Sequence, residues 1–126
     1  MSTPAESLTE EDHLSAAVLA PTATLDSDHP VVREFAASRS AGATSALEAA
    51  LQLYYAVRDE IRYDPYGASV TVESLRASTT LAEGRGWCVS KAILLAAACR
   101  SVDIPARLGF ADVRNHLSTA RMREQM

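Results

Sequence analysis

The sequence predicts a single, mostly α-helical domain. Residues 46–61 and residues 88–102 carry the clearest helical periodicity, and both segments are rich in alanine and leucine. The β-branched stretches between and after them are short. The chain has 126 residues, of which 48% are hydrophobic and 22% charged, so it is long enough for one core and typical of a folded protein.

The N-terminal part gives weaker signals. Residues 1–12 are polar and acidic, so we expect them to be disordered and assign them no function. Residues 13–30 combine a short apolar run with Pro21 and Pro30, which predicts an extended stretch or short strand followed by a turn.

A first helix is expected to begin near Pro30, because proline is favoured in the first helical turn. His29 then belongs to the preceding loop. The apolar stripe of this helix is short and consists of Val31, Val32 and Phe35.

The next helix is predicted over residues 46–61, with Ser45 as its N-cap and Asp64-Pro65 as its stop signal. Positions spaced by three and four lie on one side of it: Leu47, Leu51, Tyr54, Arg58 and Ile61. All of these except Arg58 are apolar. We therefore expect this side, with Tyr54 and Tyr55, to face the core.

Two connecting segments follow. Residues 66–75 are short, β-branched and weakly alternating, which predicts an extended connector or an edge strand. Residues 79–87 contain Gly84 and Gly86 close together, so a long helix cannot grow there and we expect a tight loop.

A core helix is predicted from Cys88 to about residue 102, because the run is apolar on nearly every side. Asp103 and Pro105 end it. Residues 105–113 are expected to form a strand, and residues 115–126 resemble the beginning of a polar helix.

The two cysteines have different surroundings. Cys88 lies at the predicted helix start, where unpaired backbone N–H groups and the helix dipole favour a thiolate and could stabilise an oxyanion. Gly86 would let a substrate approach, and Trp87 would form a cleft wall. The residues alone leave open whether Cys88 is such a nucleophile or a small apolar residue of a core helix. Cys99, among alanines, is predicted to be core.

Charge and composition exclude several classes of function. The net charge is −4 and no basic cluster occurs, which argues against nucleic-acid or membrane binding. The sequence shows neither a secretory signal nor a membrane-spanning run, so the cytoplasm is expected. The two cysteines would lie about 16 Å apart on one helix, beyond disulfide reach. Isolated histidines argue against a metal site.

Three segments together resemble the transglutaminase-like superfamily, especially its bacterial cysteine-protease branch: "VRDEIRYDPYG", "GRGWCVSKAILLAAACRSVDIPAR" and "LGFADV". The matching positions are Val57, Ile61, Tyr63, Asp64, Gly86, Cys88, Arg100, Ile104, Pro105, Ala106 and Arg107. The match spans residues 46–113. Asp103 stands where the family usually has glycine, which predicts a different helix end.

The resemblance implies an α+β, papain-like fold, of which this chain supplies the helical part, with the following antiparallel sheet absent or nearly so. It also implies that Cys88 is the nucleophile of a Cys-His-Asp triad. The reaction would be hydrolysis or transglutamination of peptide or protein amides, with no cofactor. The base is missing: His116 and Asp112 lie in unsuitable contexts, and neither is expected to serve.

Three explanations of that gap stay open: residues 1–126 are an N-terminal fragment of a longer domain, the chain is a non-catalytic binding domain on the same scaffold, or a partner completes the site. A fragment would leave the apolar face of the Cys88 helix uncovered, which predicts a homo-oligomer. Tyr63 and Tyr66, near the exit of the second helix, are candidate cleft residues together with Gly86 and Trp87.

Overall fold

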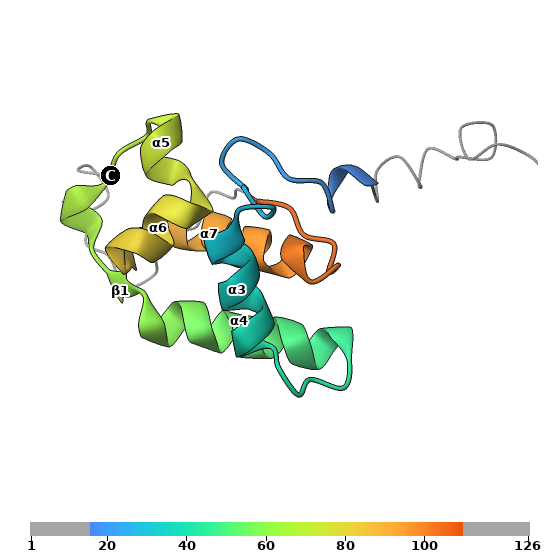
Figure 1. The fold of residues 1–126 in the computed structure, drawn as a ribbon. Helices are drawn as coiled ribbons and strands as arrows, with labels where there is room; N and C mark the ends of the chain where they lie inside the picture. The colour runs from blue at the N-terminus through green and yellow to red at the C-terminus, as the bar shows by residue number, and fades with distance from the viewer. Residues whose placement is uncertain (1–15, 110–126) are drawn as a thin grey trace, which may run out of the picture.

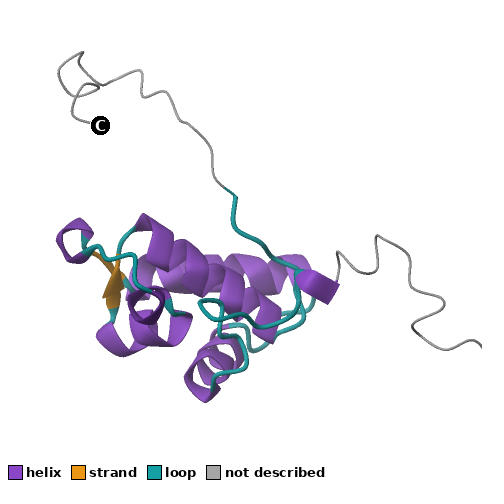
Figure 2. Cartoon of the chain, turned by 90° about the horizontal axis from the view of Figure 1, so that it is seen from above, coloured by secondary structure: helices purple, strands orange, loops and turns teal. Residues whose placement is uncertain are grey.

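The computed structural model describes residues 16–109, and in this part the protein is mostly α-helical, as predicted (Figure 1). The helices are α3 (Pro30–Arg39), α4 (Ala46–Glu60), α5 (Val72–Leu75), α6 (Ala77–Glu83) and α7 (Cys88–Ser101), with a 3₁₀ turn at Pro65–Gly67. Two short strands, β1 (Arg62–Tyr63) and β2 (Arg85–Gly86), pair in parallel, as the orange arrows of Figure 2 show.

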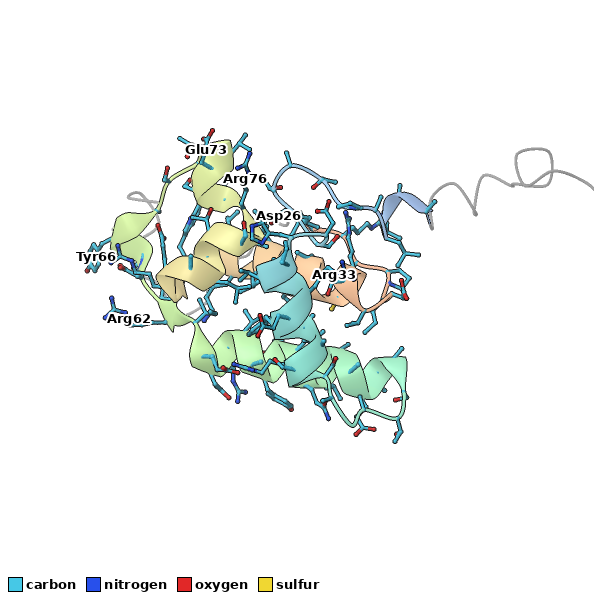
Figure 3. The ribbon with its side chains drawn as sticks, in the orientation of Figure 1. Asp26, Arg33, Arg62, Tyr66, Glu73 and Arg76 are labelled. Atoms are coloured by element: carbon cyan, nitrogen blue, oxygen red, sulfur yellow. The ribbon has the colours of Figure 1, made fainter. Side chains whose placement is uncertain are left out.

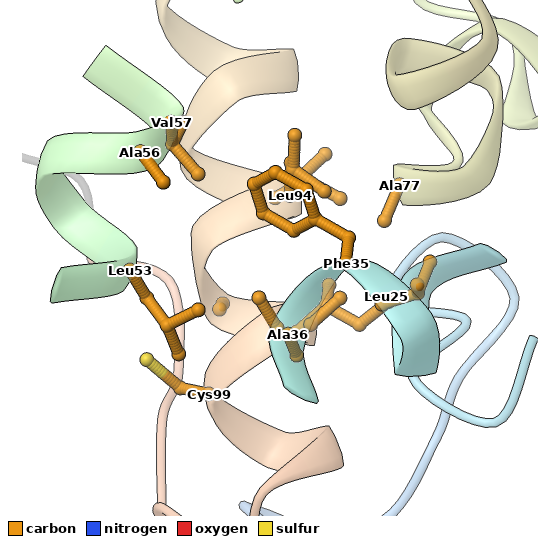
Figure 4. Close-up of a cluster of buried hydrophobic side chains, with 14 of the residues drawn as sticks. Leu25, Phe35, Ala36, Leu53, Ala56, Val57, Ala77, Leu94 and Cys99 are labelled. Atoms are coloured by element: carbon orange, nitrogen blue, oxygen red, sulfur yellow. The ribbon is translucent and has the colours of Figure 1, made fainter. Parts of the chain in front are cut away.

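Helix α7 is the centre of the fold and contacts α3, α4, α5 and α6. It is buried over most of its length, and Leu94 is completely covered. Its run of alanines, Ala96 to Ala98, lets neighbouring helix backbones approach closely. Figure 4 shows Leu94 and Phe35 at the middle of this core, between α7 and α3.

Helix α3 begins where the sequence predicts. Pro30 occupies its first turn, and Val32 and Phe35 are buried. His29, predicted as a loop residue, is the N-cap of α3. Its Nδ1 accepts a hydrogen bond from the Val31 N–H at 3.2 Å.

Helix α4 has the predicted N-cap: the Ser45 hydroxyl accepts a hydrogen bond from the Glu48 N–H at 3.1 Å. The predicted core side is wrong. Leu47 is 71% exposed, and Leu51, Tyr54 and Tyr55 are also exposed. The buried residues are Leu53, Ala56, Val57 and, just beyond the helix, Ile61. This helix is apolar on two sides, and the side with Leu53, Ala56 and Val57 is the one buried where α4 contacts α7.

The two connectors differ from the sequence prediction. Residues 66–75 contain helix α5 instead of a strand, and its N-cap Thr71 accepts a hydrogen bond from the Ser74 N–H at 3.2 Å. The expected tight loop at residues 79–87 is largely helix α6, which ends at Gly84 in the left-handed conformation, with φ of 68°.

Helix α6 forms because a distant segment caps it. The side chain of its own N-cap residue, Arg76, makes no capping bond. Instead, the Asp26 carboxylate accepts hydrogen bonds from the Ser78 N–H, at 3.2 Å, and from the Ser78 hydroxyl. The Ala77 N–H donates to the Thr24 carbonyl at 3.0 Å.

The segments at either end of the described chain are irregular. Residues 16–29 contain a helical turn and several tight turns, so the strand considered there is wrong. Residues 104–109 have no strand pairing within the described chain; the rest of the strand predicted at 105–113 lies outside the described residues.

Helix α7 ends in the conformation that glycine usually provides. Asp103 has φ of 63°, its N–H donates to the Arg100 carbonyl at 3.1 Å, and the Ile104 N–H donates to the Cys99 carbonyl at 2.9 Å. These bonds form a Schellman motif with Asp103 in the left-handed position. The expectation of a different helix end is therefore wrong, because aspartate tolerates this conformation at some cost.

Candidate active site at the start of helix α7

Cys88 is the first residue of α7, as predicted, and it is exposed. The preceding residue, Trp87, has extended backbone angles, and its carbonyl accepts the first helical hydrogen bond from the Lys91 N–H at 2.9 Å. The thiol therefore lies in the turn where helix N–H groups are not used by the helix itself.

The β1–β2 pair fixes the backbone of the residues that lead into Cys88. The Arg62 N–H donates to the Gly84 carbonyl at 3.0 Å, and the Asp64 N–H donates to the Gly86 carbonyl at 2.9 Å. The left-handed Gly84 turns the chain from α6 into β2. The position of the helix start is thus determined by β1, which directly follows α4.

Lys91 fixes α7 against the end of α4. Its ammonium group donates to the Ile61 carbonyl at 2.6 Å and to the Arg58 carbonyl at 3.3 Å. A cation at the C-terminal end of a helix is favourable because the carbonyl groups there carry partial negative charge. Sequence reasoning missed this residue; the signal was a lysine inside an otherwise apolar helical run.

A groove runs along α7 from Cys88. It has a volume of about 490 Å³ and is lined by Cys88, Val89, Ala92, Leu95, Ala96, Cys99 and residues 106–109. The floor is apolar, so the thiol lies beside a surface suited to aliphatic or aromatic groups. None of the described lining residues is a histidine or a carboxylate.

Arg100 holds the outer wall of this groove. Its side chain is buried, and the guanidinium donates to the Ala106 carbonyl at 2.9 Å and to the Ala20 carbonyl at 2.8 Å. The Ala106 N–H in turn donates to the Val18 carbonyl at 3.0 Å. Sequence reasoning noted Arg100 only as part of a motif. One acceptor, the Ala20 carbonyl, is distant in sequence, and the other belongs to a segment that was expected to be a strand.

Cys99 is a core residue, as predicted. It is 7% exposed, and burial raises the pKa of its thiol above the ordinary value. Figure 4 shows its sulfur directed toward Leu53 of α4. The two thiols of the groove are therefore chemically unequal, because only Cys88 is exposed.

The other predicted cleft residues do not lie together in the groove. Gly86 and Trp87 adjoin Cys88 but line a separate polar hollow of about 180 Å³, which Asp64 also lines. Tyr63 pairs with Gly86 across the strands and is 57% exposed. Tyr66 is 98% exposed and points outward at the edge of the molecule in Figure 3. It lines neither hollow.

The base of the expected triad is not among the described residues near Cys88. His29 is engaged at the start of α3, and His116 and Asp112 lie outside the described residues. Within residues 16–109, no group of three or more His, Cys, Asp or Glu side chains could hold a metal ion. No helix in that range is long and apolar enough to cross a membrane.

Comparison with known proteins gives one match. A family model described as the transglutaminase-like superfamily matches residues 33–124, a range that begins within α3 and includes α4 to α7 and the residues around Cys88. No curated protein and no solved structure matches the chain.

Proposed function

Because the chain belongs to the transglutaminase-like superfamily, we propose that Cys88 is the nucleophile of an acyl-transfer reaction on peptide or protein amides. The observation that carries the proposal is the exposed thiol at the first turn of α7, at one end of an apolar groove. Exposure lets the thiol reach a substrate, and a helix start offers backbone N–H groups to the oxyanion that forms on attack.

In the proposed reaction, the Cys88 thiolate attacks the amide carbonyl carbon. A carbon–sulfur bond forms, the carbon–nitrogen bond breaks, and the amine leaves with a proton donated by the protonated base of the completed site. The thioester then passes its acyl group to water, as in a protease, or to a second amine, as in a transglutaminase. Analysis of the products would distinguish these two outcomes.

A base and its carboxylate partner must complete the site. We propose that they come from outside the described residues, either from this protein or from a partner chain. Removal of these groups from a triad costs several orders of magnitude in rate. We therefore expect residues 1–126 by themselves to acylate slowly and to turn over poorly.

Thiol chemistry tests the proposal without the missing base. Iodoacetamide at pH 7 is expected to alkylate Cys88 at least about tenfold faster than Cys99, since burial protects a thiol and disfavours its thiolate. Peptide mass spectrometry would measure both rates. p-Nitrophenyl acetate should also release one equivalent of nitrophenolate as Cys88 becomes acylated.

Two single-thiol variants serve as matched controls. Cys99→Ala keeps Cys88 and should retain both the faster alkylation and the release of one equivalent of nitrophenolate, whereas Cys88→Ser should lose both. Equally slow labelling of the two cysteines would contradict the nucleophile proposal. It would favour the alternative, a non-catalytic binding domain on the same scaffold.

We further propose that the 126-residue chain forms homo-oligomers through its uncovered apolar face. This face comprises the exposed α4 side chains Leu47, Leu51 and Tyr54 and the α7 groove. A hollow of about 290 Å³ lined by Tyr54, Val57, Ala92 and Leu95, among others, connects the two parts. Contiguous apolar surface of this kind favours association.

A further inference from the structure

We propose that Ser90 is a positioning residue for Cys88, and that Gly86 and Ser90 form a matched pair that fixes the first turn of α7. The inference rests on the proposed role of Cys88 and adds the residues that hold its backbone in place. Neither residue needs to contact a substrate for this role.

The Ser90 hydroxyl makes both of its hydrogen bonds with the backbone of Trp87, the residue before Cys88. It accepts a hydrogen bond from the Trp87 N–H at 2.9 Å and donates one to the Trp87 carbonyl at 3.1 Å. Ser90 is only 3% exposed, so water cannot easily replace it. Because Ser90 binds both the backbone N–H and the backbone carbonyl of Trp87, it stabilises the extended N-cap conformation of that residue.

Position 86 has no room for a side chain, because Ser90 occupies the space beside it. A Cβ atom at position 86 would lie 2.5 Å from the Ser90 Oγ, 3.2 Å from the Thr80 Cγ2 and 3.4 Å from the Lys91 Cγ. The first of these distances is shorter than any ordinary contact. This packing explains the glycine two residues before the cysteine without reference to a substrate.

The pair also determines which N–H groups remain free near the thiol. The Ser90 hydroxyl takes up the Trp87 N–H, whereas the backbone N–H groups of Cys88, Val89 and Ser90 have no acceptor within residues 16–109. Those three groups are therefore the ones available to a negative charge that develops at Cys88. Their direction depends on the turn that Ser90 holds.

Ser90→Ala tests the inference through the chemistry of Cys88. We expect the alkylation rate at pH 7 to fall about fivefold, which corresponds to ~1 kcal/mol, the net worth of one hydrogen bond. We also expect the pH profile of that rate to move to higher pH, because a loosened first turn stabilises the thiolate less. Iodoacetamide kinetics between about pH 5 and about pH 9 would measure both the rate at pH 7 and its dependence on pH.

Ser101→Ala is the matched control. Its hydroxyl donates to the Ala98 carbonyl at 3.0 Å in the last turn of the same helix. The variant loses a hydroxyl hydrogen bond at the other end of α7, and the rate and pH profile at Cys88 should stay unchanged. A merely structural role for Ser90 would give two variants that behave alike at Cys88.

The double variant separates folding from positioning. Gly86→Ala should lower the midpoint of thermal unfolding, and adding Ser90→Ala should restore part of that loss because the clashing Oγ is gone. Alkylation of Cys88 should nevertheless remain slow. If Ser90→Ala labels at the wild-type rate with the wild-type pH profile, the positioning role is overturned. If wild-type Cys88 is itself as slow as Cys99, the proposed function fails instead.

Discussion

At the residue scale, Asp103 carries a cost that a single substitution can relieve. Its left-handed backbone strains a residue with a Cβ, and its carboxylate lies where the end of α7 carries partial negative charge. We expect Asp103→Gly to raise the free energy of unfolding by about 0.5–1 kcal/mol, after allowing for the greater freedom of glycine in the unfolded chain.

Urea denaturation followed by circular dichroism would measure this change. Asp103→Ala is the control, because it removes the charge but keeps a Cβ in the strained position. It should therefore gain less than the glycine variant. Equal stabilisation by alanine and glycine would show that charge, and not backbone conformation, determines the effect.

Residue-level predictions from the sequence succeeded where the cause is local. The Ser45 cap, Pro30 in a first helical turn and Cys88 at a helix start each depend on neighbours within a few positions. Lys91 and Arg100 could not be assigned, because the Ile61 and Ala20 carbonyls that they bind come near them only once the chain is packed. The bonds between Ser90 and Trp87 are local, and sequence reasoning overlooked them.

At the element scale, α6 depends on a cap that its own sequence does not contain. We expect Asp26→Ala to lower the free energy of unfolding by about 1–2 kcal/mol, the usual cost of losing an N-cap side chain. Thermal or urea denaturation would measure it. Asp28→Ala is the matched control, since Asp28 is exposed and makes no hydrogen bond or ion pair within residues 16–109. An equal loss in both variants would contradict the capping role.

The same dependence explains why the element-level predictions were uneven. Helix α6 was expected to be a loop because its cap lies about fifty residues away, in Asp26. Helix α4 was found correctly, but its core side was not, since both sides carry apolar residues and only contact with α7 selects Leu53, Ala56 and Val57. Hydrophobic periodicity predicts that a helix forms more reliably than it predicts which side of the helix is buried.

At the scale of the whole molecule, we propose association through the apolar face of α4 and the α7 groove, which no other part of residues 16–109 covers. We expect sedimentation velocity at micromolar concentration to show dimers or larger species. The double variant Leu47→Ser/Leu51→Ser should raise the dissociation constant about tenfold or more, because two exposed leucines lose burial at the interface.

Val70→Ser provides the control for this experiment. Val70 is apolar and 79% exposed but belongs to neither α4 nor the α7 groove. Its replacement should leave the dissociation constant unchanged. A compact monomer at every concentration would rule out the proposed association.

The sequence could predict the mostly helical domain and the family from ordered motifs, but not the composition of the whole site. Gly86, Trp87 and Cys88 are neighbours in sequence and therefore lie together at one helix start. Tyr63 and Tyr66 were grouped with them because they are aromatic and follow the exit of the second helix. The short 3₁₀ turn after Asp64 instead leaves Tyr66 exposed and away from the groove.

The guanidinium of Arg100 joins the two ends of the described chain, since it binds carbonyls of residues 20 and 106 at the same time. The Ala106 N–H also donates to the Val18 carbonyl, so a side chain and the backbone together hold the two ends. Residues 18–20 do not line the groove at Cys88, yet they support residue 106 of its wall. Without those residues, the Ala106 N–H and one guanidinium nitrogen of Arg100 would both lose their acceptors.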